Sequence, residues 1–204
     1  MSVYALKSKF QNLLRPTVKH LFERGTTANQ VTLFACAMSV FIGVVVAVGL
    51  SQSFLSSLLL LPVCLLVRMA LNAIDGMLAR EHQQQSALGG YLNELTDVVS
   101  DTALYLPLLF LPNVEAFLVW LVVWLATITE FAGVLGQVHG NGRRYDGPMG
   151  KSDRALLFGI LAVVWVFYPA SLAYTNATMW VVIGLLLFTI YRRVTQGLQT
   201  RSEA

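Results

Sequence analysis

Two rows of polar residues at helical spacing stand out in a sequence that is otherwise strongly apolar. Asn72, Asp75 and Ala79 are three and four positions apart and therefore share one helix face. The second row recurs every four residues as one stripe and consists of Gly89, Asn93, Asp97 and Asp101. Two antiparallel helices joined by a short loop would turn these rows towards each other. Their amide and carboxylate oxygens are hard ligands, which suit Mg2+ or Mn2+ and would not select zinc or copper.

Such a cluster suits displacement at a phosphorus atom of a diphosphate-linked substrate. A pair of divalent ions about 4 Å apart neutralises the phosphate charge and aligns the nucleophile with the leaving group. A nearby carboxylate can take the proton from the attacking hydroxyl. The alternative is that Asn72, Asn93 and Asp101 are polar contacts between membrane helices. However, acids that face lipid cost about 3 kcal/mol each, so the acids here must face a cavity, a metal or a partner.

Composition indicates an integral membrane protein. The 204 residues are 56% hydrophobic and 12% charged, whereas soluble domains carry about 25% charged residues. We expect an all-α fold in a single domain, residues 1–204. The basic residues flank apolar spans, so the net charge of +3 indicates orientation in a bilayer and not binding of nucleic acid.

The chain divides into an interfacial segment and a predicted bundle of six transmembrane helices over 29–197. Residues 1–25 alternate apolar and basic side chains and are expected to lie in the headgroup plane, with Pro16 kinking or dividing the segment. Thr27 and Gln30 have capping-box spacing for the next helix. The six apolar segments, each close to the roughly 20 residues that cross a bilayer, are 29–50, 55–79, 89–112, 115–138, 154–172 and 177–197.

Lysine and arginine follow the positive-inside pattern for six spans. They occur in the N-terminal segment, near residue 80, over 143–154 and over 192–201, while the loops 51–54, 113–114 and 169–178 have none. We therefore expect both termini and the candidate active site on the cytoplasmic side, in what we interpret as a bacterial inner membrane.

The two rows resemble the signature of the CDP-alcohol phosphotransferase (phosphatidyltransferase) family, D-x2-D-G-x2-A-R-x8-G-x3-D-x3-D. Asn72 and Asn93 stand at the first and third aspartates. The positions that match, with the eight-residue gap, are Asp75, Gly76, Ala79, Arg80, Gly89 and Asp97.

The resemblance implies an enzyme that moves a CDP-linked phosphatidyl or similar group onto an alcohol and releases CMP. It implies six membrane helices, often a homodimer, and two divalent metals held by the four aspartates. By position, Asp75 is a metal ligand and Asp97 is both ligand and general base. The residues that line the CDP site are Gly76, Ala79, Arg80 and Gly89.

The two asparagines alter the predicted metal site. An amide oxygen can bind a hard cation but brings no charge, so Asn72 and Asn93 weaken a site for two ions and make a single Mg2+ or Mn2+ plausible. Asp101, one turn beyond Asp97 on the same stripe, is expected to compensate.

A basic loop before the fifth span is the second candidate region. Its cations are candidates for an anion pocket that holds a phosphorylated acceptor or a lipid headgroup, or else ordinary flanking charges; they are Arg143, Arg144, Lys151 and Arg154. Arg68 and Glu130 fall within predicted spans and are expected to pair with each other or with the acid cluster.

Three functions remain open from the sequence. The leading one is a membrane transferase of phospholipid biosynthesis, with a CDP-linked donor and an alcohol acceptor. The second is a catalytically silent relative that binds CDP-lipid or metal as a sensor or assembly partner. The third is a small-solute transporter, which the intramembrane acids alone support.

Overall fold

The signals that begin the first long helix act as expected. In the computed structural model, which describes residues 3–139 and 142–199, Thr27 and Gln30 form a capping box at the start of α2 (Ala28–Ser51). The preceding helix α1 (Val3–Glu23) is continuous through Pro16, so the expectation that Pro16 divides this segment is wrong. Leu14 and Val18, on either side of the proline, both pack in a small apolar cluster with Met77. This packing supports both halves of α1.

The remaining helices follow the apolar segments with shifted ends. They are α3 (Leu60–Glu81), α4 (Ala87–Tyr105), α5 (Ala116–Val138), α6 (Lys151–Phe167) and α7 (Thr175–Leu198). Three short 3-10 helices connect them: η1 (Leu55–Leu59), η2 (Leu106–Phe110) and η3 (Pro169–Tyr174). Within residues 3–139 and 142–199 there is no strand. Helix α6 begins three residues earlier than its predicted span because the Asp153 carboxylate accepts from the Gly150 amide and caps the first turn.

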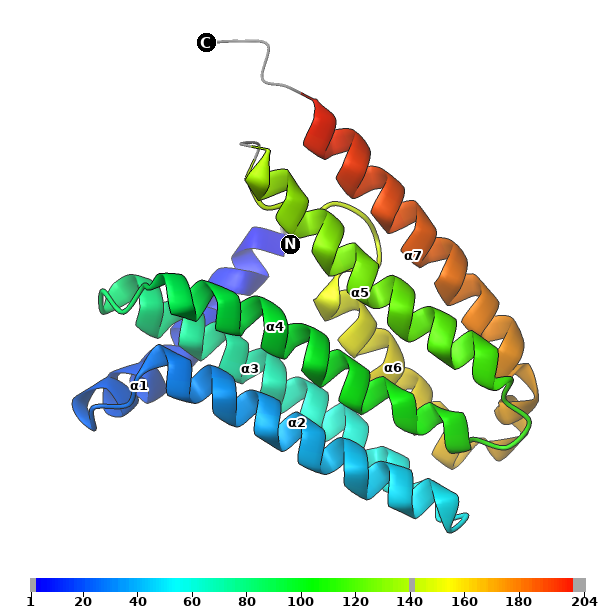
Figure 1. The fold of residues 1–204 in the computed structure, drawn as a ribbon. Coiled ribbons are helices and arrows are strands. Elements are labelled where there is room, and N and C mark those ends of the chain that lie inside the picture. Colours follow the sequence, from blue (N-terminus) through cyan, green and yellow to red (C-terminus); the bar gives the residue numbers. More distant parts are fainter. Residues whose placement is uncertain (1–2, 140–141, 200–204) are drawn as a thin grey trace.

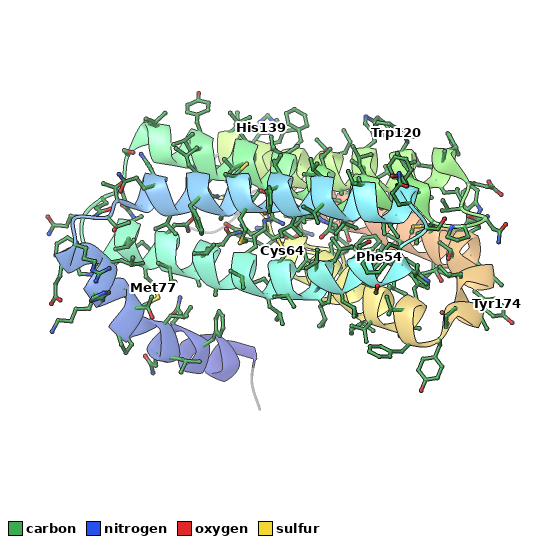
Figure 2. All side chains as sticks on the ribbon, turned by 90° about the horizontal axis from the view of Figure 1, so that it is seen from below. Phe54, Cys64, Met77, Trp120, His139 and Tyr174 are labelled. Carbon is green, nitrogen blue, oxygen red and sulfur yellow. The ribbon has the colours of Figure 1, made fainter. Side chains whose placement is uncertain are left out.

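The helices form two groups that meet along the polar rows. Helices α2, α3 and α4 lie side by side, and α5 packs along α7 (Figure 1). The contact between α4 and α5 joins these two groups, and α6 packs against α3. Figure 2 shows Met77 near α1, at the end of the bundle away from Phe54 and Tyr174. The main apolar core fills the bundle towards that far end, with fully buried Leu58, Leu104 and Leu118.

Four segments of the described chain are long and apolar enough to cross a membrane. They are Ala28–Ser51, Leu55–Glu81, Ala116–Val138 and Pro169–Leu198. Helix α4 carries three acids within eight residues, and α6 has 17 residues. The protein is thus an all-helical integral membrane protein, while the count of six spans stays a prediction.

Helices α2 and α4 approach closely at Gly43. A Cβ atom added at Gly43 would lie 2.1 Å from the backbone oxygen of Ala103. Backbone cannot move aside as a flexible side chain can. This glycine therefore fixes the distance between α2 and α4, and with it the position of the second polar row.

We expect Gly43→Ala to lower the free energy of unfolding by about 1–3 kcal/mol, because the added methyl overpacks the contact. Thermal unfolding in detergent micelles measures the change. Gly184→Ala on α7 is the matched control, since its Cβ would meet no atom within 4 Å. Equal melting temperatures for the two variants would show that the α2–α4 contact adjusts freely.

Candidate active site

The two polar rows face one cavity of about 710 Å³ at the end of the bundle near α1. Seven signature positions line it: Asn72, Asp75, Gly76, Ala79, Arg80, Gly89 and Asn93. Helix α2 adds Ala28, Asn29 and Thr32, the loop after α3 adds Gln84, Gln85 and Ser86, and the remaining lining residues are Gly90, Gln137, Arg143, Tyr145 and Lys151. The convergence predicted from spacing is therefore confirmed for these positions. Ligand sites in proteins commonly measure about 300–1,000 Å³, so the cavity has room for a nucleotide.

Glycine keeps the cavity wall open at two signature positions. A Cβ at Gly76 would come within 3.1 Å of the Arg80 guanidinium, one turn along α3. A Cβ at Gly89 would approach the Asn29 amide oxygen to 2.9 Å, where the start of α4 meets α2. Ser86 caps α4 by accepting from the Gly89 amide at 3.0 Å. Because Gly76 and Gly89 have no side chain, the Arg80 guanidinium and the Asn29 amide can keep their positions beside the cavity.

Asp75 is the carboxylate on the cavity wall. The hydroxyl of Thr32 on α2 donates to Asp75 Oδ2 at 2.8 Å, and both residues are buried. This contact orients the carboxylate from a helix that the sequence rows do not include. Thr32 carries no signal in the sequence, because its role depends on how α2 packs against α3.

Asp97 lies just beneath the cavity with both oxygens engaged. Its Oδ1 accepts from Arg68 Nη2 at 3.0 Å and from Asn72 Nδ2 at 3.2 Å. Its Oδ2 accepts from Lys151 Nζ at 2.6 Å. The carboxylate is only 4% exposed and connects α3, α4 and α6.

Asp101 lies deeper on the same stripe, between two guanidinium groups. Its Oδ1 accepts from Arg68, and its Oδ2 accepts from Arg154 Nη2 at 2.7 Å. Arg154 also donates to Glu130 Oε1 at 2.9 Å. We call these groups the buried ion-pair network; its members are Arg68, Glu94, Asp97, Asp101, Glu130, Arg143, Lys151, Arg154 and Arg193. Of the two expected pairings, Arg68 joins the acid cluster and does not pair with Glu130.

The basic loop contributes cations that already have carboxylate partners. Arg143 lines the cavity and bridges Glu94 to Glu130. Burial lowers the pKa of Arg143, but the adjacent Glu94 carboxylate, with the other negative groups, outweighs burial and raises this pKa above its ordinary value. Arg144 pairs with Asp146 at 2.8 Å. Of the four predicted basic residues, Arg143 and Lys151 reach the cavity, while Arg144 and Arg154 do not line it.

The donor set fits one hard cation better than two. No group of three or more His, Cys, Asp or Glu side chains within residues 3–139 and 142–199 is arranged to hold a metal ion. Of the five predicted metal ligands, those on the wall are the Asp75 carboxylate and the amides of Asn72 and Asn93. Magnesium and manganese accept carboxylate and amide oxygens. Two dications would bring four positive charges to a wall that carries one carboxylate, with Asp97 already paired behind it.

Comparison with known proteins finds relatives over nearly the whole chain. A family model described as CDP-alcohol phosphatidyltransferase matches residues 25–191. The Escherichia coli (strain K12) protein called Inner membrane protein YnbA is 46% identical over 203 residues, covering 100% of each chain.

Two crystal structures of the phosphatidylinositol phosphate synthase PgsA1 of Mycobacterium tuberculosis have a similar fold. The one with CDP-DAG bound has a TM-score of 0.74 at 17% identity, over 92% of this chain and 94% of that chain. The one with manganese and citrate has a TM-score of 0.75 at 18% identity, over 92% and 90%. At these identities the likeness concerns the fold.

The network predicts a structural role for Asp101. Asp101→Asn removes one charge from between two buried arginines, and we expect the free energy of unfolding to fall by about 3 kcal/mol in metal-free buffer. Thermal unfolding in detergent measures it. Glu23→Gln, which changes an exposed acid on α1, should shift stability by less than about 1 kcal/mol. Unchanged metal-free stability together with lost Mn2+ affinity would instead make Asp101 a ligand, as the sequence suggested.

Proposed function

The chain belongs to the CDP-alcohol phosphatidyltransferase family, and from this premise we propose that it transfers a phosphatidyl-type group from a CDP-linked lipid to an alcohol, with release of CMP. The observation that carries the proposal is the cavity onto which α3 and α4 turn matching signature positions. PgsA1, whose fold is similar, has been crystallised with CDP-DAG, which supports a CDP-lipid as the donor.

The donor's nucleotide would lie along the glycine-lined wall. Gly76, Ala79 and Gly89 keep side-chain bulk out of that part of the cavity, so the diphosphate can approach the helix backbones. Arg80 lines the same wall one turn from Gly76 and would pair with phosphate oxygens, which guanidinium groups bind well.

Asp97 would act as the general base. The acceptor oxygen attacks the phosphorus atom that carries the lipid group, the bond from that phosphorus to the CMP oxygen breaks, and the acceptor's proton passes to an Asp97 oxygen. Since Lys151 holds Asp97 Oδ2 at 2.6 Å, the ammonium must move off this oxygen before it can take a proton. The negative diphosphate, on entering the cavity, gives Lys151 an alternative partner.

A bound divalent ion would neutralise the diphosphate and stabilise the departing CMP. The residues that would hold it are Asp75 with Asn72 and Asn93, and Asp97 from beneath. Asp101, enclosed by Arg68 and Arg154, would support Asp97 and not reach the ion. A PgsA1 structure in complex with manganese supports a divalent metal as the cofactor.

The acceptor would enter from the side of the basic loop. Arg143 and Lys151 line the cavity there, and Tyr145 packs on Arg143 with its ring centre 5.0 Å from the guanidinium carbon. Arg144 and Arg154, which do not line the cavity, would act indirectly by holding the Asp146 and Asp101 carboxylates in place. An acceptor phosphate would have to compete with Glu94 and Glu130 for Arg143.

Placement in the membrane follows from the same reasoning. We propose six spans in one domain, with α1 at the interface and the cavity on the cytoplasmic side, as the distribution of lysine and arginine indicates. The name of the 46% identical relative supports a bacterial inner membrane. A homodimer stays a prediction.

Replacing Asp97 tests the transfer step. Asp97→Asn should reduce CMP release from CDP-diacylglycerol, measured with Mn2+ or Mg2+ across a panel of alcohols, by about 100-fold or more, because a general base contributes roughly that factor. Protection of the purified protein by CDP in a thermal unfolding assay controls for folding. Full activity in a folded, CDP-protected variant would exclude Asp97 as the base.

A second function is favoured by the two amides at the metal site: a silent relative that binds CDP-lipid or metal as a sensor or assembly partner. If so, Asn72→Asp together with Asn93→Asp should raise Mn2+ affinity and create CMP release that the natural protein lacks. Manganese binding and turnover are measured on both proteins. Strong turnover by the natural protein would rule this function out.

A further inference from the structure

Lys151 occupies an unusual place for a cation at a proposed metal site. Its ammonium is 2.6 Å from Asp97 Oδ2, and the same side chain lines the cavity beside Asn72. It is the first residue of α6, whose first turn is fixed by the Asp153 cap on Gly150. The fold therefore holds a positive charge against the carboxylate that the family signature assigns to a metal.

The amide at position 72 suits this arrangement. A carboxylate only accepts hydrogen bonds, so Asn72 must present its N–H to Asp97, as it does at 3.2 Å. An aspartate at this position would set two negative groups against each other unless a cation lay between them. With Lys151 and Arg68 already on Asp97, an N–H donor at position 72 completes the set of hydrogen bonds without adding charge.

Asp75 remains as the carboxylate open to an added ion. It lines the cavity and accepts a hydrogen bond from the neutral Thr32 hydroxyl. Asp97 pairs with Arg68 of α3 and Lys151 of α6, and one turn along α4 Asp101 pairs with Arg68 and with Arg154 of α6. Asp75 is thus the carboxylate of the cavity lining that a neutral hydroxyl holds, whereas Asp97 is already paired with two cations.

We propose that Lys151 replaces the second metal ion, so that the site loads one divalent ion near Asp75 and the lysine supplies the second positive charge beside Asp97. In a loaded site the same ammonium neutralises a diphosphate oxygen. The inference rests on the proposed function for the identity of the donor, but the ion count and the role of Lys151 can be measured without turnover.

Manganese titration of the full-length protein in detergent, followed by the EPR signal of free Mn2+, tests the proposal. The natural protein should bind one ion. Lys151→Met should raise Mn2+ affinity at least tenfold, because it frees Asp97 from a competing cation. Lys19→Met is the matched control: it removes the same charge from an exposed site on α1 and should leave Mn2+ affinity unchanged.

Three further variants guard against misfolding and against a simple charge effect. Lys151→Gln keeps a hydrogen-bond donor beside Asp97 and should also raise affinity. Asn72→Asp alone should still bind one ion, whereas Asn72→Asp with Lys151→Met should bind two. Two ions in the natural protein, no ion at all, or an Mn2+ affinity that does not rise when Lys151 is neutralised would overturn the proposal. None of these outcomes depends on CMP release, so they are distinct from failure of the transferase assignment.

Discussion

The pairing of buried carboxylates with cations is the constraint on which this structure depends. Asp97, Asp101 and Glu130 lie between helices where an unpaired charge is very costly, and each contacts at least one arginine. Arg68 and Arg154 each bridge two acids. The planar guanidinium group has several N–H donors and suits such bridging better than an ammonium group does. These bridges fix α3, α4, α5 and α6 at a single register, and that register brings the two polar rows together.

The network also divides the site into a wall and a floor. The wall towards the cavity is formed mainly by small, hydroxyl and amide side chains, with the cations Arg80, Arg143 and Lys151 and one carboxylate, Asp75. The floor beneath is densely charged and closed to bulk water. Asp97 belongs to both, since Asn72 contacts it from the wall and Arg68 from the floor. A group in this position is held accurately by the protein and can still meet a substrate once Lys151 moves.

The sequence predicted the rows and their convergence because periodicity of three and four residues and a short loop determine which faces of α3 and α4 meet. It also predicted the α2 cap from Thr27 and Gln30. The sequence left open whether Arg68 pairs with Glu130 or with the acid cluster, and it did not indicate that Arg154 pairs with Asp101, because these residues are 33 and 53 positions from Asp101 and their approach depends on tertiary packing. Thr32 was missed for the same reason, and the continuity of α1 through Pro16 depends on its packing against α3.

Charge and length explain why α4 and α6 are not among the four apolar segments, since α4 carries three acids and α6 has 17 residues. Helix α4 carries Glu94, Asp97 and Asp101, while α6 supplies Lys151 and Arg154 that neutralise two of these acids. Neither helix alone is favourable in lipid, but their charged side chains form ion pairs with each other. The more apolar helices α2 and α5 contact α4, and α3 contacts α6. In such a bundle α6 completes the compensation that Arg68 of α3 begins, so Lys151 and Arg154 serve both the packing of the helices and the site.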